Sequence, residues 1–142
     1  MNQTVTRNVV RLEGAQSLTF LPDLFGGDFM MSEASVYAYA HRYCPDYQEG
    51  FWRFYRLPDG GGYMAPDAVS LTLCNPENGF EQRVSGDVAG IILTALVLNH
   101  RSWFHSHHDH EELCRHFCRR YEQLIAFADT HPESATLWRA LD

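Results

Sequence analysis

The sequence contains no lysine, and all 11 of its basic residues are arginine. With 18 acidic residues, the formal net charge is −7. A protein that binds DNA nonspecifically must place cations on phosphates so that counterions are released. The chain therefore does not fit the class of nonspecific DNA binders, and we expect no direct DNA binding.

An acidic imitation of DNA is also a poor fit to the charge distribution. Residues 1–71 carry 8 acidic and 5 basic residues, a net charge of −3, and residues 72–142 carry 10 and 6, a net charge of −4. A duplex presents one charge per about 1.7 Å of its axis. Because the 11 arginines are spread over both halves of the chain, the sequence does not predict an acidic face of that density.

Cysteine is sparse, and long apolar runs are absent. The four cysteines are Cys44, Cys74, Cys114 and Cys118. The first ten residues lack the apolar region of about 7–15 residues that marks a secretory signal. The longest apolar run, residues 88–98, contains Gly90 and Thr94 and is shorter than the roughly 20 residues that span a bilayer. We therefore expect a cytoplasmic protein with reduced thiols and no membrane partner.

The length of 142 residues and the 45% hydrophobic content fit one globular domain with its own core. Residues 1–16 are polar and lack a sustained periodicity, which predicts a loose N-terminal arm. Its apolar members Val9, Val10 and Leu12 can add a short edge strand. Residues 17–142 are predicted to form a single domain.

The hydrophobic periodicity predicts an α+β fold. Residues 30–43 repeat apolar side chains at helical spacing, with Ser32 as a suitable N-cap. Four strands with short connections then predict an antiparallel meander, over residues 51–57, 63–65, 70–74 and 80–84. Three helices follow, the first capped by Ser85, the second after Asp109 and the third over residues 132–141. One helix before the four-stranded meander and three after it favour helices packed on one face of the sheet.

Histidines are concentrated in one segment of the chain. Six of the eight lie between positions 100 and 116: His100, His105, His107, His108, His110 and His116. Within this segment His110, Cys114 and Cys118 are spaced i, i+4 and i+8, so a helix would place these zinc-ligand types on one face. The alternative function is therefore a small zinc-binding module or metal-dependent enzyme built on residues 105–118. Neither a Cys-x2-Cys nor a His-Glu-x-x-His pair is present, so the leading interpretation contains no metal and no other cofactor.

The sequence offers no catalytic residues. Its serines lack a Gly-x-Ser-x-Gly context, and Gly60–Gly62 has no following Lys-Ser/Thr, as a phosphate loop would. Glu111 and Glu112 are adjacent acids of the kind that favour the first turn of a helix through its dipole. We therefore do not expect an enzyme.

The aromatic segment of residues 50–66 is the best candidate for a binding surface. Tryptophan and arginine anchor many protein interfaces. The predicted interface residues are Trp52, Arg53, Tyr55, Gly61 and Tyr63. A second use of Trp52, Arg53 and Tyr55 is the stacking of single-stranded bases, which the net charge disfavours.

Five segments occur in an order that resembles the ArdB/KlcA antirestriction family. In residues 50–66, an aromatic Trp-x-Phe-Tyr strand runs into a Gly-Gly-x-Tyr-x-Ala-Pro return. The other segments are Phe20–Gly26, Ser85–Ile91, Leu98–His100, and His131–Ser134 together with the terminal Arg139–Asp142. The resemblance covers residues 18–142, and the histidine-rich junction 105–110 departs from it.

The resemblance implies an antirestriction protein of plasmids, phages and other mobile genetic elements. Such proteins relieve DNA cleavage by type I restriction–modification systems, and the resemblance brings no catalytic residues with it. Together with the charge distribution, it predicts protein binding or an indirect route rather than imitation of DNA. The expected partner is a type I restriction–modification complex or another host protein.

Overall fold

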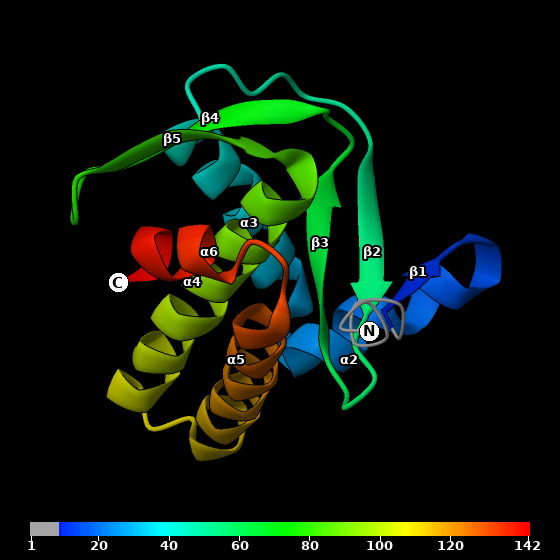
Figure 1. Cartoon of the computed structure of the whole chain (residues 1–142). Helices are drawn as coiled ribbons and strands as arrows, with labels where there is room; N and C mark the ends of the chain where they lie inside the picture. Colours follow the sequence, from blue (N-terminus) through cyan, green and yellow to red (C-terminus); the bar gives the residue numbers. More distant parts are fainter. Residues whose placement is uncertain (1–8) are drawn as a thin grey trace.

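Helix α4 (Gly86–His107) runs along one edge of strand β3 (Gly62–Pro66), and the other elements are arranged around this pair (Figure 1). A computed structural model describes residues 9–142 of the chain. The remaining strands are β1 (Val10–Leu12), β2 (Trp52–Arg56), β4 (Ser70–Asn75) and β5 (Phe80–Ser85). The remaining α-helices are α2 (Phe20–Phe25), α3 (Phe29–Tyr43), α5 (Glu111–Thr130) and α6 (Ser134–Leu141). Two 3-10 helices, η1 (Gly14–Thr19) and η2 (Gly26–Asp28), flank α2.

The expected α+β class is confirmed, but the single four-stranded meander is wrong. The described strands form two antiparallel sheets, one with the order β1-β2-β3 and one that pairs β4 with β5. Strand β2 pairs with β3 from Trp52 opposite Pro66 to Arg56 opposite Gly62. Strand β4 does not continue this sheet, because the other edge of β3 is covered by a helix.

Two small residues of α4 allow the helix to cover that edge. A Cβ atom built at Gly90 would lie 2.3 Å from Cβ of Ala65 and 2.6 Å from the carbonyl oxygen of Met64, closer than real atoms approach. One turn later, Thr94 Oγ1 accepts a hydrogen bond from the Met64 N–H and donates one to the Met64 carbonyl, each at 3.2 Å. The threonine hydroxyl therefore satisfies the buried backbone groups that a neighbouring strand would otherwise pair.

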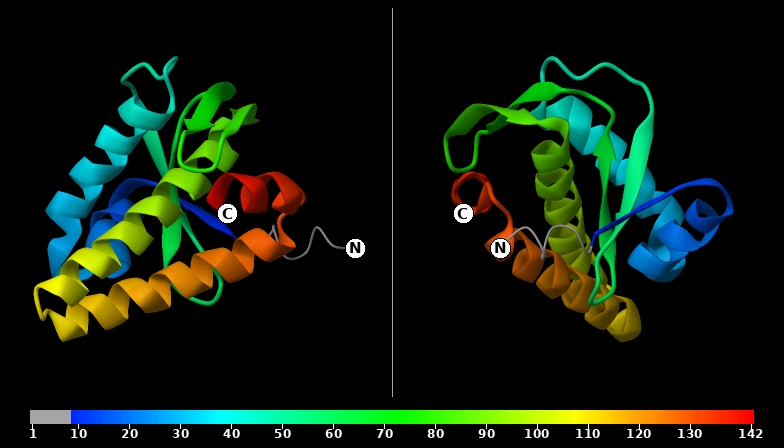
Figure 2. Two further views of the ribbon diagram at one scale, coloured as in Figure 1. Left: turned by 90° about the vertical axis from the view of Figure 1, so that its left-hand side faces the viewer. Right: turned by 45° about the vertical axis from the view of Figure 1, so that its right-hand side comes forward.

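The helices lie on both faces of the three-stranded sheet rather than on one. The ring of Phe54 stacks on Phe20 of α2, and Trp52 meets Tyr37 of α3 edge to face. On the opposite face, Tyr63 stacks on Phe127 of α5. Residues 52 and 54 share one side of a strand, and residues 53 and 55 share the other. Figure 2 shows α3 and α5 on different sides of the central helix.

The N-terminal part of the domain is more helical than the sequence indicates. Residues 20–25 form the short helix α2, with Pro22 in its first turn, where the missing backbone N–H of proline is tolerated. Helix α3 begins at Phe29, so Ser32 is an interior residue and the expected N-cap at Ser32 is wrong. Residues 1–8 of the predicted loose arm lie outside the described residues, and residues 10–12 form the expected edge strand β1 beside β2.

The helices after the sheets follow the predicted pattern. The side chain of Ser85 caps α4 by accepting a hydrogen bond from the Val88 N–H at 3.1 Å, as expected. Helix α4 is buried along most of its length, and α5 packs beside it. Within residues 9–142, no helix combines the length and the apolar character needed to cross a membrane.

The close approach at Gly90 predicts an unusual response to substitution. In an ordinary helix interior, Gly→Ala stabilises by about 1 kcal/mol. Here we expect Gly90→Ala to lower the free energy of unfolding by roughly 1–3 kcal/mol, because the added methyl group overpacks against β3. Urea unfolding measures the change.

Gly27→Ala is the matched control, since a Cβ at Gly27 has no neighbour within 4 Å. The control should unfold within about 0.5 kcal/mol of the parent. Equal effects of the two substitutions would contradict the proposed contact between α4 and β3.

Candidate functional site

The turn between β2 and β3 is held against α5. Gly60 and Gly61 have φ angles of +107° and +72°, a backbone region that residues other than glycine rarely adopt. Gln123 of α5 donates a hydrogen bond to the carbonyl oxygen of Asp59 at 2.7 Å, and Arg120 lies against Gly61. The two glycines therefore allow the end of the hairpin to pack tightly against α5.

The structure separates the five predicted interface residues. Trp52 and Tyr63 are 8% and 2% exposed, and Gly61 is buried beneath α5. Arg53 and Tyr55 are partly exposed and occupy the same side of β2. Of the predicted set, these two residues are therefore the ones that a partner could reach without rearrangement.

Arg53 and Tyr55 are held in place by their neighbours. The Arg53 guanidinium contacts both oxygens of Asp67 at 3.3 Å and lies 5.2 Å from the centre of the Phe51 ring. The ring of Tyr55 stacks on that of Tyr63 at a centroid distance of 4.9 Å. Burial, followed by the carboxylate of Asp87, raises the pKa of Tyr55 above its usual value.

Tyr63 belongs to a partly buried chain of polar side chains at the start of α4. Its hydroxyl donates a hydrogen bond to Asp87, whose other carboxylate oxygen lies 3.1 Å from Nε2 of His131. Burial and the Asp87 carboxylate both raise the pKa of Tyr63, so the phenol stays protonated and keeps its role as donor. This chain joins β3 and the segment before α6 to the first turn of α4.

The histidine and cysteine candidates do not converge. Cys114 and Cys118 lie one turn apart on α5, as their spacing predicts. His110 instead directs Nδ1 toward Nδ1 of His105, at 2.9 Å. Within residues 9–142, no group of three or more His, Cys, Asp or Glu side chains is arranged to hold a metal ion.

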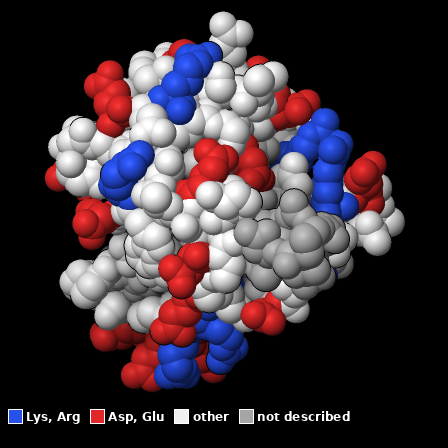
Figure 3. All heavy atoms as spheres, in the orientation of Figure 1, with Lys and Arg blue, Asp and Glu red and all other residues white. Residues whose placement is uncertain are grey.

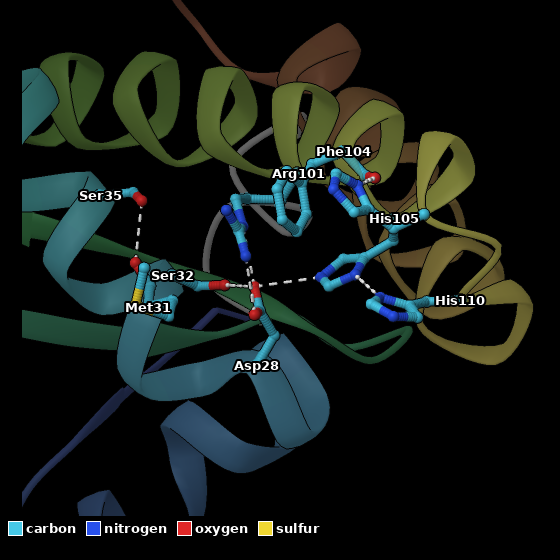
Figure 4. Close-up of polar contacts among 9 residues, drawn as sticks. Asp28, Met31, Ser32, Ser35, Arg101, Phe104, His105 and His110 are labelled. Carbon is cyan, nitrogen blue, oxygen red and sulfur yellow. Dashed lines mark hydrogen bonds and ion pairs between the residues drawn. The ribbon is translucent and has the colours of Figure 1, made fainter.

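A buried ion cluster is centred on Asp28, at the point where η2 meets α3 (Figure 4). Arg101 of α4 contacts the carboxylate with two nitrogens, at 2.8 and 2.9 Å. Ser32 donates a third hydrogen bond at 2.8 Å. The ring of Phe104 lies 4.2 Å from the Arg101 guanidinium carbon. The cluster therefore ties the start of α3 to the last turns of α4.

His105 extends this cluster to the start of α5. It is 3% exposed, and its Nε2 atom lies 3.3 Å from Asp28, an ion-pair distance without the geometry of a regular hydrogen bond. Its Nδ1 atom faces His110, and a hydrogen bond between two imidazole nitrogens needs one donor and one acceptor. The Asp28 carboxylate, His105 and His110 thus form a line from α3 to the surface at the α4–α5 junction.

The members of the Asp28 cluster cannot be paired from the sequence alone. Asp28 and Arg101 are 73 positions apart, and no local pattern joins them. The position of Arg101 does indicate that it is paired, because a cation near the end of an almost wholly apolar helix requires a partner. The sequence pattern therefore indicates that Arg101 needs a negatively charged partner, but it does not identify which acid that is.

The Asp28 cluster predicts a pH-dependent stability. Burial alone would raise the pKa of Asp28, but hydrogen bonds from Arg101 and Ser32, with His105 nearby, outweigh it and hold the pKa below its usual 3.8. The Asp28 carboxylate therefore stabilises the folded state fully above its unfolded-state pKa of 3.8. This stabilisation is lost as the pH falls through the lower pKa of the folded state. Asp28→Asn should lower the free energy of unfolding by roughly 3–5 kcal/mol at neutral pH, because Arg101 stays buried without its counter-charge.

Urea unfolding of the parent and of Asp28→Asn between neutral and acidic pH measures this effect. The difference between the two should shrink as Asp28 becomes protonated. Asp59→Asn is the control and should match the parent at every pH, because residue 59 is exposed and the bond from Gln123 goes to its backbone carbonyl. A difference between parent and Asp28→Asn that does not change with pH would contradict the role of the carboxylate charge.

Relatives of known sequence resemble the chain along nearly its whole length. A putative antirestriction protein YubI from Escherichia coli strain K12 is 48% identical over 138 residues, covering 97% of this chain and 96% of its own. An antirestriction protein KlcA from Escherichia coli is 40% identical over 143 residues, covering 99% of this chain and 97% of its own.

A solved structure has the same fold. It matches with a TM-score of 0.79 and 36% sequence identity, and the match covers 94% of this chain and 95% of that one. It comes from work on the KlcA and ArdB proteins, which describes a novel fold and antirestriction activity against type I DNA restriction systems in vivo but not in vitro. A sequence model for antirestriction proteins matches residues 45–142. The ordered segments, the shared fold and these identities show that the chain belongs to the antirestriction protein family.

Proposed function

We propose that this protein relieves DNA cleavage by type I restriction–modification systems, by binding a protein or by an indirect route. The observation that carries the proposal is the 94% coverage and 36% identity to a structure from proteins with antirestriction activity against type I systems in vivo. The activity of those proteins in vivo but not in vitro supports a route that requires a further component of the cell. The role requires no catalysis by this chain.

The charged surface supports this route over imitation of DNA. Acidic and basic side chains are interspersed on the face that Figure 3 shows. Five arginines of the described chain pair with acids, which are Asp23, Asp28, Asp46, Asp67 and Glu111. Acids that are neutralised by arginines do not reproduce the regular phosphate charges of a duplex.

Phage plating tests the function directly. Unmodified phage is plated on a type I restricting strain with and without this protein, and phage already modified by that strain serves as the control. We expect the protein to raise the plating of unmodified phage toward that of modified phage. Unchanged plating with a soluble, folded protein would refute the proposal.

We further propose that the partly exposed side of β2 contacts the partner, with Arg53 and Tyr55 as the contact residues. Arg53→Ala should reduce the relief of restriction by about tenfold or more, because arginines at an interface centre can contribute 2 kcal/mol. The free energy of unfolding should change by less than about 1 kcal/mol, since exposed ion pairs contribute little.

Arg83→Ala is the matched control. Arg83 forms a similar exposed ion pair, with Asp46 at 3.1 Å, but belongs to β5 in the other sheet. It should leave the relief of restriction unchanged. Equal plating with the two variants would argue against an interface on β2 while leaving the antirestriction role itself intact.

A further inference from the structure

A pocket of about 340 Å³ opens beside the start of β2. Its walls are the rings of Tyr37 from α3, Tyr47 and Phe51 from the loop before β2, and Trp52 and Phe54 from β2. The volume lies within the roughly 300–1,000 Å³ typical of small-molecule sites. Of the five predicted interface residues Trp52 alone lines this pocket. The antirestriction role does not account for such an aromatic cavity.

The rings stand at steep angles to one another, as the walls of a box do. Tyr37 and Tyr47 each meet Trp52 edge to face, with interplanar angles of 69° and 70° and centroid distances of 5.3 and 5.9 Å. His41 meets Tyr47 at 73° and a centroid distance of 4.9 Å. Several aromatic rings therefore border one pocket that is open to solvent.

Hydrogen bonds hold three of these rings in place. The Trp52 indole N–H donates to the Tyr47 hydroxyl at 2.8 Å. The Tyr37 hydroxyl donates to Glu33 at 2.7 Å. Rings fixed before binding lose little conformational freedom when a ligand enters, so more of the contact energy contributes to affinity.

The charge at the pocket is negative. Glu49 lines it and is 83% exposed, with its carboxylate 3.2 Å from Nε2 of His41. No arginine lines the pocket, and the chain contains no lysine. The guanidinium of Arg53, already paired with Asp67, lies 5.2 Å from the Phe51 ring centre, so this ring already contacts one cation.

We propose that this pocket binds an organic cation of the alkylammonium class. The aromatic faces attract the cation through their quadrupoles, and the alkyl groups displace water from the apolar walls. Glu49 supplies the opposite charge at the mouth of the pocket. A quaternary ammonium compound and a lysine side chain of a partner protein share this chemistry, and the experiment distinguishes them.

The experiment uses the purified full chain and follows the indole N–H resonance of Trp52 by nuclear magnetic resonance, assigned with Trp52→Phe. The probes are choline, Nα-acetyl-lysine methylamide, and 3,3-dimethylbutan-1-ol, a neutral analogue that has a carbon in place of the choline nitrogen. Sodium chloride is titrated in parallel to match the ionic strength. A saturable shift of the Trp52 resonance reports occupancy of the pocket.

We expect at least one of the two cations to bind roughly tenfold more tightly than the neutral analogue, as one fixed positive charge among aromatic faces would give. Tighter binding of choline identifies a small ammonium compound as the source, and tighter binding of the lysine derivative identifies a protein side chain. Equal binding of the neutral analogue, or no saturable shift with either cation, would overturn the proposal.

Two variants test the site without disturbing the core. Glu49→Gln and Phe51→Ala alter residues that are exposed, and each should weaken cation binding about threefold or more. Glu112→Gln, on the exposed side of α5, is the matched control and should bind as the parent does. Binding that both pocket variants leave unchanged would also refute the site. Because these measurements need no restriction system, a negative result leaves the proposed antirestriction role untouched.

Discussion

The close contact between α4 and the edge of β3 determines the arrangement of the other elements. Gly90 allows the helix backbone to approach the strand, and Thr94 satisfies the buried N–H and carbonyl groups of Met64. A helix thereby takes the position that a fourth strand would occupy. The chain after Pro66 must turn away, which is why β4 and β5 form a separate sheet. An apolar helix that covers a strand edge also protects that edge from pairing with another molecule.

Charged side chains at the two ends of α4 connect it to the rest of the molecule. Asp87 in the first turn bonds Tyr63 of β3 and His131 before α6, while Arg101 in the last turns bonds Asp28 at the start of α3. His105 adds a link to the start of α5. Breaking a buried ion pair leaves an uncompensated charge, so sliding the helix along its neighbours would be costly. We interpret these contacts as fixing the position of α4 in a core that is otherwise apolar.

Two of the five segments that carry the family resemblance lie at this same contact. The Gly-Gly-x-Tyr-x-Ala-Pro stretch is the hairpin turn and β3, and the Ser85–Ile91 segment begins α4 and contains Gly90. These residues have clear packing roles, which explains why the recognisable motifs reveal the fold and family but not a mechanism. The surfaces offered for binding, the exposed side of β2 and the aromatic pocket beside it, lie next to this scaffold rather than within it.

Local sequence patterns predict the element types from residue 30 onward, the β2–β3 hairpin and the Ser85 cap, but not the short helix α2. Each of these predictions follows from local spacing, because side-chain periodicity and turn residues act between near neighbours in the chain. The family follows instead from the resemblance of five ordered segments. The packing of distant segments, by contrast, places β3 beside a helix instead of β4, makes Asp28 the partner of Arg101, and turns His110 toward His105 instead of Cys114. Periodicity reports that a residue is buried or needs a partner. The partner itself depends on how distant segments pack. Apolar burial is non-directional, so it does not by itself select which segments meet.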